Sequence, residues 1–274
     1  TATLLHGAAS ATPWLYLAAG ALLLAASLQV LARQREGFTL VIVLGAACWV
    51  IGTALWAFGA PVYRVVAWWI AFLVLTIAGE RLELSRFLPP SVTARRAFAG
   101  IVVLLLGSLA AWPLAGAPHA FGMALLALAA WLLKQDIARR TVKQQGLTRF
   151  IAVCLLSGYF WLAVGGGVIA FAGLAPGNPA YDAALHALLL GFVFSMVFGH
   201  APIIFPAVLR VAVPYHPVFY VPLALLHLSL ALRLAGDLAV QPDWRSMGGA
   251  LNAVALLAFI LNTIAAVIRG KLKT

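Results

Sequence analysis

Long apolar runs with few charged residues alternate with short polar segments along the whole chain. Each run is about 20 residues long, the length of helix that crosses the hydrocarbon core of a bilayer. The runs are too long and too uniformly apolar for barrel strands, whereas a helix satisfies its own backbone hydrogen bonds. The pattern predicts nine transmembrane helices, at residues 13–32, 39–59, 62–79, 97–115, 119–135, 149–173, 182–206, 217–236 and 246–268.

The composition agrees with this interpretation. Hydrophobic residues make up 64% of the chain, charged residues only 9%, and the mean hydropathy is +1.04. A soluble domain carries about 25% charged residues, because its surface faces water. We therefore expect an all-α, polytopic transmembrane helix bundle. Residues 1–274 form a single integral membrane domain in this interpretation, with membrane lipid as its surroundings.

The loop charges predict the orientation. With nine spans, 15 of the 18 Lys and Arg residues fall on one side of the membrane, and only Arg64, Arg233 and Arg245 fall on the other. Basic loops face the cytoplasm, so the N-terminus is expected outside and the C-terminus in the cytoplasm. The net charge of +11 then belongs to loops that meet anionic lipid, and it requires no nucleic-acid partner.

Histidines are the main candidates for chemistry inside the membrane. His119 is expected at the outer face, His186 about one turn into the seventh span and His200 near that span's inner end. His216 is expected at the inner face, and His227 near the middle of the eighth span. Neutral imidazole is a common ligand of haem and metals, and ionisable residues within a membrane are functional candidates. All five are therefore candidate metal ligands.

A second interpretation stays open for the histidines at helix ends. His6, His119 and His216 can each simply bond a carbonyl group or water at the interface. His227 lies deep in hydrocarbon, where an unpaired imidazole is costly, so a functional role is favoured there. Arg233 either pairs with Asp237 four residues later or binds a haem propionate.

The stretch HALLLGFVFSMVFGH places His186 and His200 at the two ends of an uncharged segment. In a regular α-helix, 14 residues correspond to about 320° of net rotation and about 21 Å of rise. The two side chains would then project from nearly the same face, one toward each leaflet. Gly191 and Gly199 are expected to leave room for a bulky group beside this helix. Such a helix can hold two stacked haems, or a haem and a second site.

Two groupings of these histidines follow. His186 and His227 lie at similar depth on consecutive helices and can flank one haem iron, with His119 as a third member. His200 and His216 form a separate inner pair. The connector between them, APIIFPAVLRVAVPY, contains prolines that are expected to end the helix. Tyr181 and Asp182 are expected to cap the seventh span.

The segment HALLLGFVFSMVFGHAPIIFPAVL resembles the histidine-bearing helices of the NnrS family, bacterial haem- and copper-containing membrane proteins linked to nitric-oxide stress. It is also loosely similar to the catalytic subunits of haem-copper oxidases. The resemblance implies haem b ligated by His186, His200 and His227 in a multi-pass protein of the bacterial inner membrane. Copper stays open, because the tight His-x-His pair of that family is absent from this chain.

We therefore expect a haem b-binding membrane protein, with copper as an additional candidate, that transfers electrons or handles a small gas such as nitric oxide or oxygen. The cofactor-binding candidates are His186, His200, His227 and Arg233, and no catalytic residue is assigned. A redox partner is expected. Two alternatives stay open: a transporter or channel, and a non-catalytic subunit of a larger membrane complex. Few carboxylates lie within the spans, which counts against a proton-coupled carrier.

Overall fold

The computed structural model describes residues 2–84, 90–112 and 114–271, with side chains from residue 11 onward. The described chain is helical, and nine of its helices are long and apolar enough to cross a membrane. This confirms an all-α bundle of nine spans. The side chain of His6 lies outside the described residues.

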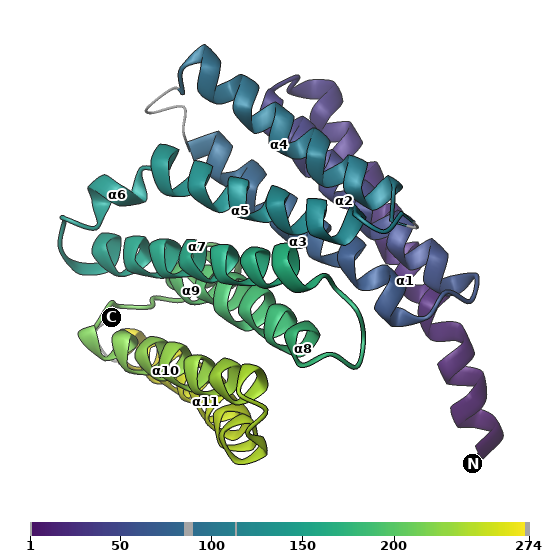
Figure 1. The fold of residues 1–274 in the computed structure, drawn as a ribbon. Helices are drawn as coiled ribbons and strands as arrows, with labels where there is room; N and C mark the ends of the chain where they lie inside the picture. Colours follow the sequence, from purple (N-terminus) through teal and green to yellow (C-terminus); the bar gives the residue numbers. More distant parts are fainter. Residues whose placement is uncertain (1, 85–89, 113, 272–274) are drawn as a thin grey trace. The chain divides into compact units, whose positions relative to one another are not determined.

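Eight of the spans contain one long helix, and the seventh is a continuous run of three helical segments (Figure 1). The single helices are α1 (Ala2–Arg33), α2 (Gly37–Ala57), α3 (Val62–Leu84), α4 (Val92–Ala110), α5 (Ala117–Gln135), α7 (Gly146–Ala172), α10 (Tyr220–Leu238) and α11 (Pro242–Lys271). The seventh span joins α8 (Pro179–His186), the π-helical η2 (Ala187–Val193) and α9 (Phe194–Leu209). The short α6 (Ala138–Thr141) lies in a connection, and the short η3 (Pro217–Phe219) directly precedes α10 within the eighth span.

Two compact units make up the described chain. The first contains residues 1–91 with 105–110, and the second contains residues 92–104 with 111–274. In the first unit, α2 packs against both α1 and α3. Trp69 in α3 donates its indole N–H to Thr53 Oγ1 in α2 at 3.2 Å, which gives a polar group inside the apolar contact its partner.

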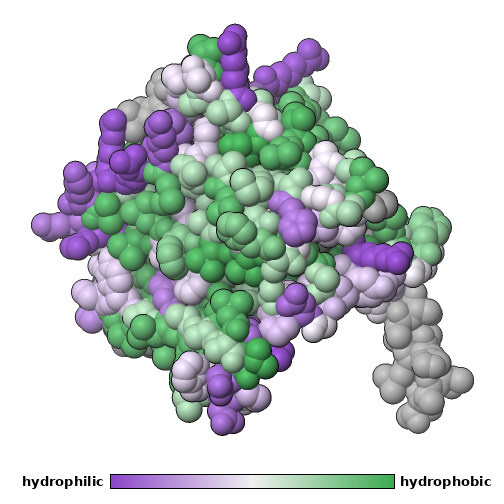
Figure 2. All heavy atoms as spheres, viewed as in Figure 1, coloured by the Kyte–Doolittle hydropathy of each residue, from purple (hydrophilic) through white to green (hydrophobic). Residues whose placement is uncertain are grey.

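The second unit contains the histidine-bearing helices. Within it α5 packs on α7, α7 packs on η2 and α9, and α10 packs along α11. Hydrophilic side chains gather near α6 and the adjacent ends of α5 and α7, while much of the visible face is hydrophobic (Figure 2). Apolar side chains on the outside of a bundle are the expected surface for contact with lipid.

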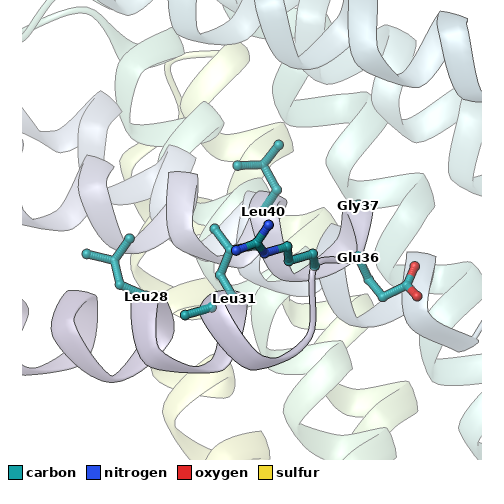
Figure 3. A pocket seen from close by; sticks show the side chains of 7 residues that line it. Leu28, Leu31, Glu36, Gly37 and Leu40 are labelled. Carbon is teal, nitrogen blue, oxygen red and sulfur yellow. The ribbon is translucent and has the colours of Figure 1, made fainter.

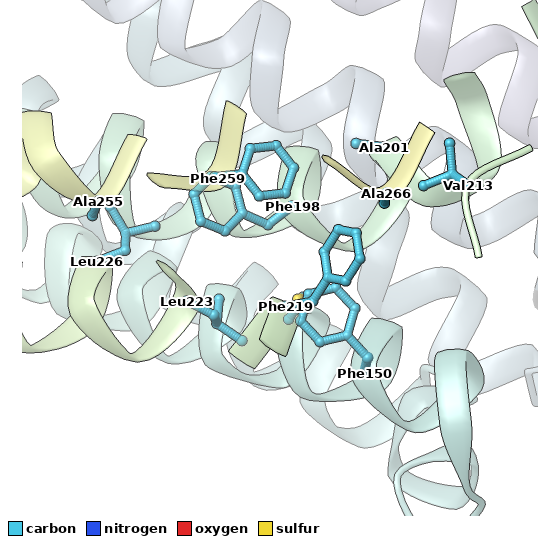
Figure 4. Close-up of a cluster of buried hydrophobic side chains, with 11 residues drawn as sticks. Phe150, Phe198, Ala201, Val213, Phe219, Leu223, Leu226, Ala255, Phe259 and Ala266 are labelled. Carbon is cyan, nitrogen blue, oxygen red and sulfur yellow. The ribbon is translucent and has the colours of Figure 1, made fainter. Parts of the chain in front are cut away.

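An aromatic core fills one end of the second unit. Phe198 in α9 stacks on Phe259 in α11, with ring centroids 3.8 Å apart, and both side chains are buried (Figure 4). Phe150 from α7 and Phe219 from η3 complete this cluster from the other side. The space between α7, α9, α10 and α11 at this level is therefore occupied by protein side chains.

The prolines after His200 do not end the helix as the sequence predicted. Pro202 and Pro206 both lie inside α9, which continues to Leu209. The non-helical connector begins only at Arg210, which adopts a left-handed conformation with φ of 53°. Proline has no backbone N–H, so each proline leaves a carbonyl oxygen of the preceding turn without its usual donor. In a membrane bundle, other groups can bond to such an oxygen, and the helix can therefore continue.

Glycines allow α5 and α7 to approach closely. A Cβ atom on Gly122 would collide with the backbone of Ala170 and of Gly166. Small residues at helix contacts are the usual device for packing in a membrane, because apolar burial gives no advantage over lipid. Gly100 in α4, by contrast, has no neighbouring atom within 4 Å of such a Cβ.

We predict that Gly122→Ala lowers the thermal stability of the purified protein, whereas Gly100→Ala does not. Overpacking a tight contact costs about 1–3 kcal/mol. An unhindered Gly→Ala change in a helix gains up to about 1 kcal/mol. Thermal unfolding of both variants in the same detergent measures the difference. Equal unfolding temperatures would show that the α5–α7 contact is looser than described.

Candidate functional site

A cluster of ion pairs connects α8, α10 and α11. Asp182 in α8 accepts a hydrogen bond from Arg233 Nη2 in α10 at 2.8 Å and from Arg245 Nη2 in α11 at 3.3 Å. These pairs join residues 51 and 63 positions apart in the sequence. The side chain of Arg233 is only 15% exposed, so its charge needs a partner within the protein.

Asp237 completes this cluster from the end of α10. Its side chain is fully buried, and its Oδ1 lies 3.0 Å from Arg245 Nε. Neither carboxylate oxygen accepts a hydrogen bond from a described residue, so the ion pair lacks hydrogen-bond geometry. We call Asp182, Arg233, Asp237 and Arg245 the outer ion cluster. It balances two carboxylates with two guanidinium groups.

The expected pairing of Arg233 with Asp237 is therefore replaced by pairs between helices. Arg233 reaches Asp182 on α8, and Arg245 from α11 takes the place opposite Asp237. Glycines make this possible: a Cβ on Gly236 would collide with the backbone of Arg245, and one on Gly248 would meet the backbone of Arg233. The close contact between α10 and α11 thus places both guanidinium groups within reach of both carboxylates.

A cavity of about 280 Å³ lies beside the outer ion cluster, between the end of α10 and the start of α11. Arg233, Asp237 and Arg245 line it, together with Gln241 and Ser246. This is the end of the helices that the loop charges predict to face away from the cytoplasm, and we call it the outer end. Pro179, Gly236, Val240 and Pro242 complete the lining, so these polar groups sit in a mostly apolar wall.

His186 extends the same region along α8. Its Nδ1 lies 2.8 Å from the backbone oxygen of Asp182 and 3.5 Å from the carboxylate Oδ1 of the same residue. Because a carbonyl oxygen only accepts, Nδ1 carries the proton in this bond, and in the neutral ring the lone pair is then on Nε2. Metal-ligating histidines use this arrangement, in which a carbonyl or carboxylate orients the ring from behind.

Two other histidines also bond a backbone oxygen through Nδ1. His200 Nδ1 lies 2.6 Å from the oxygen of Met196, one turn earlier in α9. His119 Nδ1 lies 2.9 Å from the oxygen of Ala170, which ties the start of α5 to the end of α7. His119 is exposed. The bond that it makes is the interfacial carbonyl contact considered from the sequence, and it also leaves the lone pair on Nε2.

The π-helical segment η2 changes the angle between His186 and His200. A π turn contains one residue more than an α turn, so it shifts all later positions by about 100°. The net rotation between the two histidines becomes about 220° instead of about 320°. The prediction of a shared face was wrong, because it assumed a regular α-helix. Such π turns are frequent at functional sites.

His227 has a different protonation pattern. Trp161 in α7 donates its indole N–H to His227 Nδ1 at 2.9 Å, and the two ring planes are inclined by 27° with their centroids 6.3 Å apart. In the neutral ring, the proton is then on Nε2, which is buried without a hydrogen-bond partner among the described residues. A protonated nitrogen cannot bind a metal, so His227 ligates only if Trp161 releases it.

The glycines of the seventh span do not leave open space. A Cβ on Gly191 would collide with Trp161 and approach Leu230, and one on Gly199 would lie 3.0 Å from the Cβ of Cys154. The expected room for a bulky group beside these glycines is thus filled by α7 and α10. Their small size instead permits close packing of the helices.

The remaining sequence-predicted residues have local roles. His216 is exposed, and its Nδ1 accepts a hydrogen bond from the backbone N–H of Val218 at 3.2 Å, at the start of η3. Asn178, and not Tyr181 or Asp182, caps α8, because its side chain accepts from the backbone N–H of Ala180 at 2.9 Å. Because Asn178 caps the helix, the carboxylate of Asp182 is available for the outer ion cluster. The sequence analysis did not predict this cluster.

Among the described residues, no group of three or more His, Cys, Asp or Glu side chains is arranged to hold a metal ion. Another cavity lies at the α1–α2 turn, where Leu28, Leu31 and Leu40 surround it together with Arg35 and Glu36 (Figure 3). Its lining contains no histidine. The outer ion cluster, with His186 beside it, is the stronger candidate site.

A known family matches nearly the whole chain. The family described as "Domain of unknown function (DUF8744)" covers residues 1–268. The chain belongs to this family. The match includes every histidine and ends at residue 268, within the last of the spans that the structure describes. No curated protein and no solved structure matches the chain.

We predict that Asp182→Asn destabilises the protein, because it leaves Arg233 without its anionic partner. Breaking a buried pair costs about 3–5 kcal/mol, and the partial exposure of Asp182 reduces this to about 1–3 kcal/mol. The matched control is Asp243→Asn, which changes an exposed carboxylate in the first turn of α11. Thermal unfolding in detergent should separate the two variants, and an equal effect of both would contradict the cluster's structural role.

Proposed function

We propose that this protein is a multi-pass protein of the bacterial inner membrane that binds haem b through histidine and takes part in electron transfer or in the handling of a small gas. Bound haem would supply one-electron chemistry or a position for a diatomic ligand. The proposal builds on the segment from His186 to Leu209, which resembles histidine-bearing helices of haem proteins.

The hydrogen bond of His186 is the observation that carries the proposal. Its Nδ1–H donates to the backbone of Asp182, and the carboxylate of Asp182 lies behind the same nitrogen. Asp182 is in turn fixed by Arg233. In metal sites, a backbone carbonyl or a carboxylate commonly accepts the second ring N–H of a ligand histidine, and this bond fixes the tautomer and the orientation of the ring.

The other residues that the sequence predicted to bind a cofactor have different roles in this proposal. His200 has the same Nδ1 bond, so it is the candidate for a second, inner site, about 20 Å away along the helix once the π turn is taken into account. His119 is a candidate for a further ligand at the outer end. His227 stays in its bond with Trp161, and Arg233 holds Asp182 instead of a propionate. Copper is tested separately by elemental analysis.

A transporter or channel is the second candidate function. The observation that favours it is the outer ion cluster, which gathers two carboxylates and two guanidinium groups beside a cavity. Intramembrane ionisable residues of this kind mark ion and solute pathways. This candidate predicts a colourless protein with a solute-dependent or proton-dependent flux in liposomes. A subunit role predicts a partner that co-purifies.

Absorption spectra of the detergent-purified protein, oxidised and then reduced with dithionite, test the proposal. We expect a Soret band in the wild-type protein and its loss in His186→Ala, because that change removes the imidazole that would hold the haem. The matched control is His216→Ala, which removes an exposed imidazole that only caps η3 and should keep the band. In His200→Ala, loss of part of the absorbance would identify a second haem.

A wild-type protein that is colourless after expression with added haem precursor would contradict the proposal. The same holds for a Soret band that persists unchanged in His186→Ala. In the first case, the transporter and subunit candidates would lead, and copper analysis would decide whether a colourless metal is present. In the second case, haem would be bound by other residues.

A further inference from the structure

Polar side chains follow the contact between α10 and α11 inward from the outer end. Ser229, Arg233 and Asp237 recur every four residues on α10, so they lie on one face of that helix. Arg245 and Asn252 lie on the facing helix α11, where Arg245 pairs with Asp237 and Asn252 pairs with Ser229. We call these five residues the polar seam.

At each turn of the polar seam, at least one polar atom is buried without a hydrogen-bond partner among the described residues. Both carboxylate oxygens of Asp237, the Nε of Arg233 and the Nδ2 of Asn252 are buried without a hydrogen-bond partner among the described residues. Ser229 Oγ bonds to Asn252 Oδ1 at 2.6 Å and so leaves the amide donor of Asn252 unused. In native proteins such groups are paired, and where protein atoms do not pair them, ordered water does.

The outer end of the polar seam opens into the cavity of about 280 Å³, which Arg233, Asp237 and Arg245 line. From Asp237 to Ser229 the helical rise is about 12 Å. This is less than half of the roughly 30 Å hydrocarbon core. Polar side chains therefore recur at each turn of α10 from the cavity to near the middle of the span, beside the backbone contact that Gly248 makes with Arg233.

Apolar side chains close the inner end. One turn beyond Ser229 and Asn252 lie Leu226 and Ala255, both fully buried, followed by the stacked rings of Phe198 and Phe259 (Figure 4). These four apolar side chains offer water no hydrogen-bond partner. The polar path is thus open on one side of the membrane and closed on the other.

We propose that the polar seam is a water-filled half-channel, which admits water and protons from the outer side as far as Asn252 and Ser229. Asp237 and Asn252 supply the acceptors and donors that each water needs, and the guanidinium groups hold the two helices at this spacing. The inference requires no haem, so it does not depend on the proposed function.

Accessibility of engineered cysteines to silver ions tests the half-channel. The background is Cys48→Ala with Cys154→Ala, which removes both native, buried thiols. Ser229→Cys and Asn252→Cys are then exposed to silver nitrate from the outer side in chloride-free buffer. The remaining thiols are counted with a maleimide after denaturation. Silver ions are close to water in size and react with the thiolate, which forms only where water reaches.

We expect both seam thiols to be blocked at least about tenfold faster than the thiol of Leu228→Cys, because thiolate formation requires water. Leu228 lies at the same depth on α10 but is 70% exposed on the outside of the bundle. Ala255→Cys, one turn below the seam, should stay unreactive. Equal slow rates at positions 228, 229 and 252 would overturn the proposal and show a dry ion-pair seam.

Folding and haem content are controlled separately. Ser229→Cys replaces a single oxygen atom by sulfur, so we expect it to fold. If Asn252→Cys is not monodisperse in gel filtration, the rate at position 229 alone decides whether water reaches the polar seam. The measurement is repeated on protein from haem-deficient cells. Fast blocking in a protein that stays colourless after expression with added haem precursor would refute haem binding and keep the half-channel, whereas slow blocking in a haem-containing protein would do the reverse.

Discussion

Hydrocarbon offers no hydrogen-bond partner, so every polar side chain buried in this bundle needs one within the protein or from trapped water. This constraint explains the arrangement around Asp182. Its carboxylate joins Arg233 and Arg245, its backbone oxygen accepts from His186, and three helices are held together as a result. The charges that are costly in lipid thereby determine which helices lie side by side at the outer end of the second unit.

Helix α10 separates two kinds of polar environment. Toward α7, His227 accepts the indole N–H of Trp161, in a contact packed by Gly191 of the π-helical segment. Toward α11, the polar seam contains carboxylate, guanidinium and amide groups whose bonding is incomplete. The first environment fixes one imidazole tautomer. The second has the composition of a hydrated path, and the two occur on opposite sides of the same helix.

The spans were predictable from the sequence, because length and apolarity alone decide which segments cross a membrane. The site was predictable only in part. Asp182 and Arg233 were visible as intramembrane charges, but no local pattern reveals a pair 51 residues apart. The π turn was missed because it leaves no periodicity signal, and the angle between His186 and His200 changed with it. Pro202 and Pro206 suggested a helix end, yet α9 continues through both.

The opposite tautomers of His186 and His227 are the central claim about the site, because they decide which ring presents a lone pair on Nε2. Nitrogen-15 NMR of histidine-labelled, haem-free protein tests this directly, with His186→Gln and His227→Gln as assignment controls. Protonated and unprotonated ring nitrogens of neutral imidazole give separate signals. We predict the proton on Nδ1 of His186 and on Nε2 of His227. The same tautomer at both positions would contradict the account.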